Sequence, residues 1–236
     1  MHPSQILFLD IETVSSVSHF NELDPHWQGL WTHKSKFQIQ SDPDKPIEEI
    51  YHDRAAIFAE FGKICCISVG AIKDHQFRVK SFYGTSEIVL LTAFLSMIET
   101  HYNHAERAAF CGHNIKEFDI PFICRRAAIL GLELPGILKI NGKKPWELSH
   151  IIDTLELWKF GDYKHYTSLD LLAACFNLAS SKSDISGKDV GDVFWVEQDL
   201  PRIARYCSQD VILTARVYYK LLNLGEIPDD MIQIIA

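Results

Sequence analysis

The chain has 236 residues, of which 47% are hydrophobic and 23% are charged, and its net charge is −8. This composition is typical of a soluble globular protein, and no run approaches the ~20 apolar residues that a membrane-spanning helix needs. The negative charge argues against a broad electrostatic grip on duplex DNA or RNA, but it allows a small site that handles one nucleic-acid end through divalent cations.

The N-terminus and the cysteines indicate a cellular compartment. The first residues lead directly into a predicted strand without a secretory signal, which predicts a cytoplasmic protein. The six cysteines form no Cys-x-x-Cys pair and the 11 histidines form no His-x-x-x-His pair, so the sequence lacks the usual spacings of zinc ligands. We therefore expect buried free thiols in a reducing compartment.

Apolar and alternating runs predict three strands in the first part of the chain, at 5–13, 62–72 and 76–84. The first two strands are separated by a polar, proline-containing excursion at 15–60, which ends in a short helix near 47–60. This excursion is longer than a compact fold needs, and we expect it to border a substrate cleft or to contact a partner.

Helices and strands are predicted to alternate in the rest of the chain. Ser86 can cap a helix that runs to about residue 101, and a fourth strand at 107–114 leads into a helix that begins near Pro121 and stops at Gly131. The remaining elements are a loop over 132–149 with a hairpin at Asn141–Gly142, a strand at the start of 150–158, a helix over 167–178 capped by Thr167 or Ser168, a polar loop over 179–199 and a long helix over about 201–222. This order predicts an α/β fold, a mixed β-sheet flanked by α-helices, in a single domain over 1–236.

Two acids, Asp10 and Glu12, interrupt the first predicted strand. They share one face because side chains alternate along a strand, whereas Leu9 and Ile11 point into the core. Burying unpaired carboxylates costs several kcal/mol, and two close carboxylates repel each other. A divalent cation that accepts oxygens from both removes both penalties. The alternative interpretation is that the strand emerges into solvent at Asp10.

A third acid, Asp119, is predicted at the start of the helix near Pro121. An ordinary first-turn acid, stabilised by the helix dipole, is one interpretation. The surroundings favour another, because Asn114 follows a strand and Phe118 precedes the acid. An amide that bonds a sugar and an aromatic ring that stacks on a base are what a single-stranded end requires.

A fourth acid, Asp210, lies in the middle of the last predicted helix. Tyr206 is one turn earlier on the same face, as residues i and i+4 are. The opposite stripe, which includes Cys207 and Val211, is also apolar, so the helix is predicted to be largely buried and a free Asp210 would be costly. A solvated Asp210 is the alternative.

Taken in order, D-x-E on the first strand, N-x-x-x-F-D-x-P-F in the middle and Y-x-x-x-D on the late helix resemble the DEDD superfamily of 3′–5′ exonucleases. The sequence looks most like the stand-alone bacterial proteins related to the proofreading exonuclease domain of family B DNA polymerases. The resemblance covers nearly the whole chain. It indicates the Tyr subclass, because Tyr206 stands four residues before Asp210, whereas the His subclass would need histidine in place of Arg205.

The resemblance implies a ribonuclease H-like fold and two Mg²⁺ or Mn²⁺ ions that support hydrolysis at the 3′ end of single-stranded nucleic acid. Carboxylates suit these hard cations. Asp10 is then expected to bridge both ions. Glu12 and Asp210 complete the nucleophile-side ion, and Asp119 holds the second. Tyr206 is expected to position the attacking water.

Other residues are weaker candidates for contacts with nucleic acid. Phe118 and Asn114 are expected to touch the terminal nucleotides, the alternative being a core residue and a turn residue. Thr13 can offer its backbone N–H to the 3′-hydroxyl, by resemblance only. For Lys182, Lys188 and Asp153, solvated lysines and a helix-start or turn acid are the favoured interpretations.

Three functional hypotheses follow. DNA is favoured over RNA as the substrate of the exonuclease, and an RNA 3′-end-processing exoribonuclease of the same fold is the first alternative. A non-catalytic nucleic-acid-binding module is the second, although it predicts the loss of at least one of the four acids, all of which are present. Because the sequence shows no polymerase domain, proofreading would require a polymerase or repair protein in trans.

Overall fold

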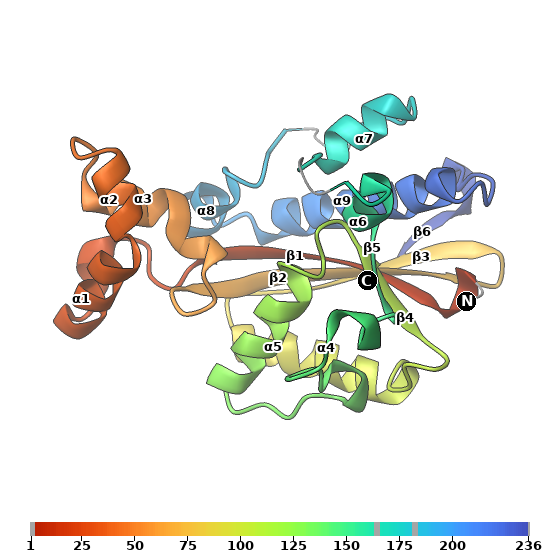
Figure 1. Cartoon of the computed structure of the whole chain (residues 1–236), viewed down its shortest axis with the longest axis horizontal. Helices are drawn as coiled ribbons and strands as arrows, with labels where there is room; N and C mark the ends of the chain where they lie inside the picture. The colour runs from red at the N-terminus through yellow and green to blue at the C-terminus, as the bar shows by residue number, and fades with distance from the viewer. Residues whose placement is uncertain (1–2, 163–165, 181–183, 236) are drawn as a thin grey trace.

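A mixed β-sheet forms the centre of the computed structural model, which describes residues 3–162, 166–180 and 184–235. Six strands lie in the order β5-β4-β1-β2-β3-β6, with helices on both faces (Figure 1). β1 pairs antiparallel with β2 and parallel with β4. The strands are β1 (Ile6–Ser15), β2 (Gly62–Lys73), β3 (Gln76–Tyr83), β4 (Ala109–Gly112), β5 (Ile151–Asp153) and β6 (Ile232–Ile235). The predicted mixed sheet flanked by helices is confirmed.

The helices follow the predicted order through most of the chain. Ser168 caps α7 by accepting a hydrogen bond from the N–H of Leu171, and Gly131 follows α5 with φ of +68°. The helices are α1 (Pro25–Lys34), α2 (Lys36–Ser41), α3 (Ile47–Arg54), α4 (Glu87–His101), α5 (Asp119–Ile129), α6 (Thr154–Lys159), α7 (Leu169–Cys175), α8 (Val190–Asp192) and α9 (Leu200–Leu221). Within the described ranges, no helix is long and apolar enough to cross a membrane.

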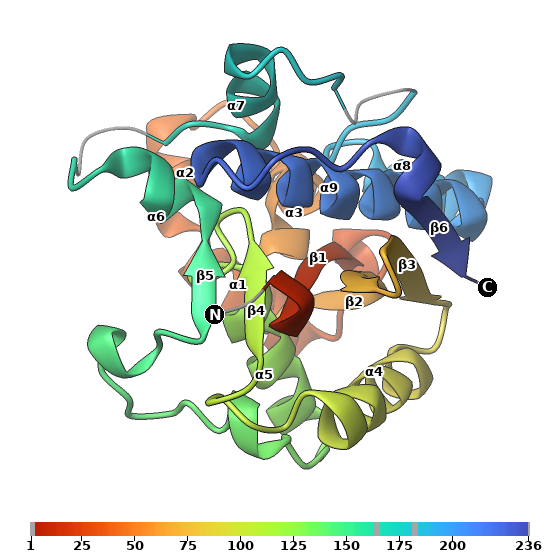
Figure 2. The same ribbon diagram turned by 90° about the vertical axis from the view of Figure 1, so that its right-hand side faces the viewer.

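The two faces of β1 belong to different cores. Leu9 and Ile11 pack with α4 and α5 on one face, as the alternation predicts, whereas Phe8 packs with Val211 of α9 on the other. Figure 2 shows α9 along one side of the sheet and α4 along the opposite side. Residues 10 and 12, which alternate with Leu9 and Ile11, therefore lie on the side of α9.

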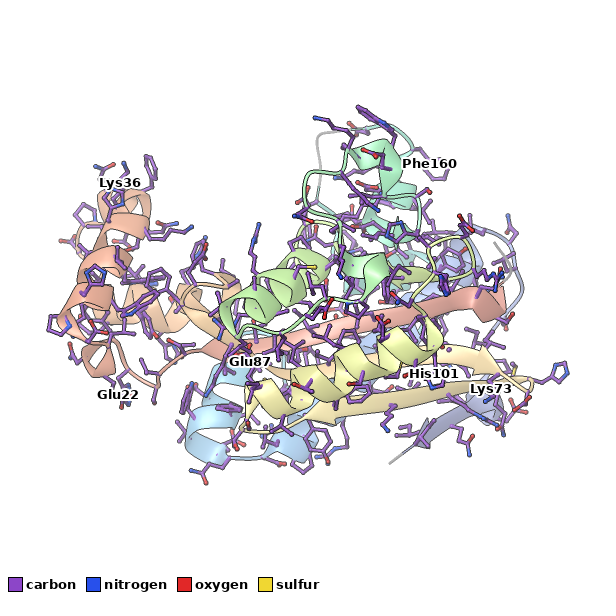
Figure 3. All side chains as sticks on the ribbon, turned by 90° about the horizontal axis from the view of Figure 1, so that it is seen from below. Glu22, Lys36, Lys73, Glu87, His101 and Phe160 are labelled. Carbon is purple, nitrogen blue, oxygen red and sulfur yellow. The ribbon has the colours of Figure 1, made fainter. Side chains whose placement is uncertain are left out.

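The excursion after β1 is a helical subdomain with a small core of its own. It contains α1 and α2 as well as the expected α3, and Phe20, Trp31 and Tyr51 are buried together in it. The short helix predicted near 47–60 is confirmed by α3, whereas α1 and α2 were not predicted. α1 buries only Trp31 and α2 buries no residue, so neither has an apolar stripe for periodicity to detect. Figures 1 and 3 show this subdomain, which carries Glu22 and Lys36, at the end of the sheet opposite the turn at Lys73.

Three further expectations were wrong in detail. The polar loop predicted at 179–199 contains α8 and a π-helix (Val193–Glu197). At Asn141–Gly142 there is a turn between two 3₁₀-helices and no hairpin, since Pro145 cannot donate to a strand ladder. β6 was not expected. This strand has four residues and pairs with β3. Four residues are too few for an alternating pattern to identify a strand.

The cysteines are free, as predicted, but not all are buried. Four of the six are buried, Cys124 is partly exposed and Cys175 is exposed.

Candidate active site

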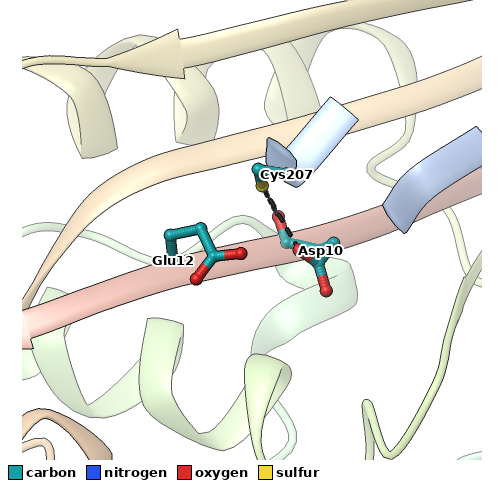
Figure 4. A group of neighbouring side chains, drawn as sticks. All are labelled: Asp10, Glu12 and Cys207. Atoms are coloured by element: carbon teal, nitrogen blue, oxygen red, sulfur yellow. Dashed lines mark hydrogen bonds between the residues drawn. The ribbon is translucent and has the colours of Figure 1, made fainter. Parts of the chain in front are cut away.

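Asp10 and Glu12 lie together on β1, facing α9 (Figure 4). Glu12 is buried and Asp10 is partly exposed, so the alternative in which both acids emerge into solvent does not hold. The register of β1 with β2 shifts between Glu12 and Thr13. Such bulges re-aim side chains and are common beside active sites.

Asp119 reaches the same place from α5. It is the first residue of this helix, and its Oδ1 accepts a hydrogen bond from the backbone N–H of Ile11 at 3.1 Å. Because Ile11 lies between Asp10 and Glu12, this bond fixes the first turn of α5 against the pair of acids. Asp119 is therefore both a helix-start acid and a member of the cluster.

Asp210 and Tyr206 complete the group from α9. A side-chain hydrogen bond joins them one helical turn apart, as their spacing predicts. Asp210 is close enough to raise the pKa values of Asp10, Glu12 and Asp119. The structure therefore brings together all five residues that the sequence predicts to be catalytic.

The electrostatics of this cluster favour a positive ligand. Burial, followed by the charge of Asp210, raises the pKa values of Asp10 and Glu12 well above their ordinary values. Burial also raises the pKa of Asp119 to about 7, although its own N–H and that of Ile11 favour the ionised form. Converging carboxylates that resist ionisation on their own are a donor set that fits hard divalent cations such as Mg²⁺ or Mn²⁺.

Tyr206 remains protonated in this environment. Burial raises its pKa, and the charges of Asp210, Glu12 and Asp10 raise it further. Its hydroxyl can therefore donate a hydrogen bond but is a poor base.

Cys207 is a member of the site that was not anticipated. Its Sγ donates a hydrogen bond to Asp10 Oδ2 at 3.3 Å (Figure 4). One potential metal-ligand atom from each of Asp10, Glu12 and Cys207 lies within 4.8 Å of the other two. The predicted stripe that puts Cys207 on the face opposite Asp210 was wrong. Residues three apart on a helix are also neighbours, and this spacing was the available signal.

A groove with a volume of ≈ 1120 Å³ adjoins the acids. Glu12, Thr13, Phe118 and Tyr206 line it. One wall comes from the 15–60 excursion and includes residues of α3, and the other comes from residues 186–196. The excursion thus borders a cleft next to the acids, as expected from its length.

The candidate nucleic-acid residues occupy different positions relative to this groove. Phe118 packs against the core and also lines the groove, and its contact with the terminal nucleotides stays a prediction. Thr13 Oγ1 donates to the carbonyl of Ala56, joining β1 to the excursion. Asn114 has φ of +63°, a turn conformation that asparagine tolerates better than most residues. Lys188 lines the groove, and Lys182 lies outside the described residues.

Asp153 holds the loop that leads to Asp119. It caps α6 through the N–H of Leu155, which confirms the helix-start interpretation. The same carboxylate also accepts hydrogen bonds from the backbone N–H groups of Asn114 at 2.9 Å and Lys116 at 3.2 Å. This positioning role was not predicted, because it depends on a contact between residues far apart in the sequence.

A buried ion pair anchors α5 from its other end. Two nitrogens of Arg126 donate to the two carboxylate oxygens of Glu87 on α4, at 2.9 and 2.7 Å. Glu87 also accepts the N–H of Ile64 on β2, and Arg126 donates to the carbonyl of Ala59. These bonds tie α5, and hence Asp119, to α4, β2 and the end of the excursion.

Comparison with solved structures places this fold in a known class. The structure of the family B DNA polymerase from the hyperthermophilic archaeon Pyrobaculum calidifontis is similar, with a TM-score of 0.61 and 17% identity, over 94% of this chain and 25% of the polymerase chain. The chain thus spans a quarter of the length of that polymerase. The likeness supports the predicted ribonuclease H-like α/β fold.

The family follows from the sequence match. Residues 57–230 match the family described as "Predicted 3'-5' exonuclease related to the exonuclease domain of PolB", and the chain belongs to this family. No curated protein matches the chain. The matched span contains Asp119, Tyr206 and Asp210 but begins after Asp10 and Glu12, which the fold brings to the same site.

Proposed function

We propose that the protein is a 3′–5′ exonuclease of the Tyr subclass that removes nucleotides from the 3′ end of single-stranded DNA with the help of two divalent cations. The convergence of Asp10 and Glu12 from β1, Asp119 from α5, and Tyr206 and Asp210 from α9 carries this proposal. It supplies acidic ligands and a hydroxyl donor beside an open groove.

The carboxylates of Asp10, Glu12, Asp119 and Asp210 would hold the cations. When bound, the cations supply Lewis-acid activation of water and neutralise charge that develops on the phosphate.

The protein side chains supply orientation. The N–H of Ile11 fixes the Asp119 carboxylate, and the Cys207 thiol fixes that of Asp10. The Tyr206 hydroxyl donates to Asp210, and its oxygen can accept a hydrogen bond from a water at the wall of the groove. Thr13 and Phe118 border the same space, in positions that suit contacts with the terminal nucleotide.

Digestion of an oligodeoxynucleotide labelled at its 5′ end tests the proposal. In Mg²⁺ or Mn²⁺, the wild-type protein is expected to shorten it from the 3′ end one nucleotide at a time, and EDTA is expected to stop the reaction. Asp10→Asn and Asp210→Asn are expected to abolish shortening because each removes a cation ligand. Tyr206→Phe is expected to lower turnover by a smaller factor, because the cations remain.

The matched control is Asp44→Asn, which changes an exposed acid outside the groove and is expected to behave as the wild type. Shortening by Asp10→Asn or Asp210→Asn at the wild-type rate would refute the site. The same digestion with an RNA oligonucleotide of matched sequence tests the exoribonuclease alternative. Proofreading in trans for a polymerase or repair protein stays a prediction. The single domain over residues 1–236 also stays a prediction.

A further inference from the structure

Trp195 is an aromatic residue of the groove for which the proposed function has no role. It lies in the π-helix that precedes α9 and lines the groove together with Tyr206 and Phe118. Short π-helical turns are rare in proteins, and those that occur are often at functional sites. Here the turn places an indole ring in the groove that adjoins the acids.

The indole ring is held by the strands that carry the site. Its N–H donates to Ser15 Oγ at 3.2 Å, and Ser15 is the last residue of β1. Lys63, which pairs with Val14 across the sheet, lies over the ring with its Nζ 4.3 Å from the ring centroid. A ring fixed in this way loses little conformational entropy when a flat ligand stacks on the part that borders the groove.

Cationic side chains stand on both walls of the same groove. Arg54 ends α3 on the excursion, and Lys188 precedes α8 on the opposite wall. Among the residues that the structure describes, neither has an ion-pair partner. Two acids of the groove are paired with other side chains, Asp53 with Lys45 and Asp192 with His52. Each wall of the groove therefore carries a cationic side chain that suits a phosphate group.

We propose that Trp195 stacks on a base of the single strand while Arg54 and Lys188 contact its phosphates. This inference rests on the proposed function and assigns the path of the strand beyond the reacting end. Stacking tolerates any base because every base has a π-face, and a duplex hides those faces. The groove therefore selects unpaired bases with little regard to sequence.

Tryptophan fluorescence tests the stacking directly. The full chain carrying Asp210→Asn, which removes hydrolysis under the proposed function, is titrated in Mg²⁺ with a short oligothymidylate. Emission is expected to be quenched on binding, and Trp195→Phe is expected to abolish most of the quenching. The control is Trp146→Phe, which changes an exposed tryptophan outside the groove and is expected to leave the quenching unchanged.

Affinity provides the second measurement. Trp195→Ala is expected to weaken binding of the oligothymidylate by roughly 5- to 150-fold, the range that corresponds to ~1–3 kcal/mol for one stacked base. Trp195→Phe keeps an aromatic ring and should lose less. In the active protein, Trp195→Ala should raise KM more than it lowers kcat. Arg54→Gln and Lys188→Gln should each reduce the salt dependence of binding.

The outcomes separate this inference from the proposed function. Quenching that persists in Trp195→Phe, or equal quenching by a blunt duplex, would overturn the stacking role while digestion by the wild type stands. If the quenching depends on Trp195 but the wild-type protein releases no nucleotides, the stacking is upheld and the exonuclease activity is refuted. Circular dichroism of each variant confirms its fold, and Trp195→Phe carries the test if Trp195→Ala does not fold.

Discussion

Asp119→Asn is expected to make the metal-free protein more stable, by an amount that depends on pH. Asp119 is 3% exposed, and burial, the largest cause, raises the pKa of its carboxyl from 3.8 to about 7. In the variant, the amide oxygen can still accept the hydrogen bond from Ile11, but no charge has to be buried. The substitution therefore removes an electrostatic cost and keeps the bond to β1.

The sign and size of the effect follow from proton binding. Between pH 3.8 and about 7 the folded protein holds a proton on Asp119 that the unfolded chain has released, so the free energy of unfolding falls as pH rises. Below this window the group has no effect, and above it the cost is complete. The difference between the two pKa values, at ~1.36 kcal/mol for each pH unit, corresponds to about 4 kcal/mol.

Urea denaturation in EDTA, followed by circular dichroism at pH 4 and pH 8, measures this effect. The variant is expected to match the wild type at the lower pH and to exceed it by up to about 4 kcal/mol at the higher pH. Asp44→Asn, at an exposed position, is the control and should show no such divergence. A difference between Asp119→Asn and wild type that is the same at both pH values would refute the reasoning.

Added cations should reduce the stability advantage of Asp119→Asn at pH 8. A ligand that binds only the folded state stabilises it by ~2.7 kcal/mol at a concentration 100 times its Kd. Mg²⁺ or Mn²⁺ at pH 8 should therefore stabilise the wild type more than Asp119→Asn, because the variant lacks one of the proposed ligands. Equal stabilisation of both proteins would exclude Asp119 from the cation site.

Two predictions concern the scaffold. Arg126→Met should destabilise the fold by ~3–5 kcal/mol in urea denaturation, because it leaves the charge of Glu87 buried without a partner. Adding Glu87→Gln to this variant should recover much of the lost stability. If Arg126→Met alone is as stable as the wild type, the prediction is contradicted. Gly70→Ala should cost ~1–3 kcal/mol, since its Cβ would lie 2.5 Å from Cζ of Phe77, whereas Gly29→Ala, in an open position of α1, should stabilise by up to ~1 kcal/mol.

Local patterns in the sequence predicted the elements that carry the acids. Alternation assigned Asp10 and Glu12 to one face of β1, and the helical period aligned Tyr206 with Asp210, because both rules depend only on neighbouring residues. Contacts across the chain had no such signal. The bonds from Asp153 to the loop before Asp119 join residues 37 and 39 positions apart, and the thiol of Cys207 meets an acid 197 positions away.

One strand coordinates the site and the groove. Three residues near the end of β1 each bond a different part of the molecule: Ile11 holds Asp119 on α5, Thr13 holds the excursion through Ala56, and Ser15 holds Trp195 on the opposite wall. The acids at positions 10 and 12 flank the first of these anchors, Ile11. A displacement of the end of β1 would therefore move the proposed cation ligands and both walls of the groove together.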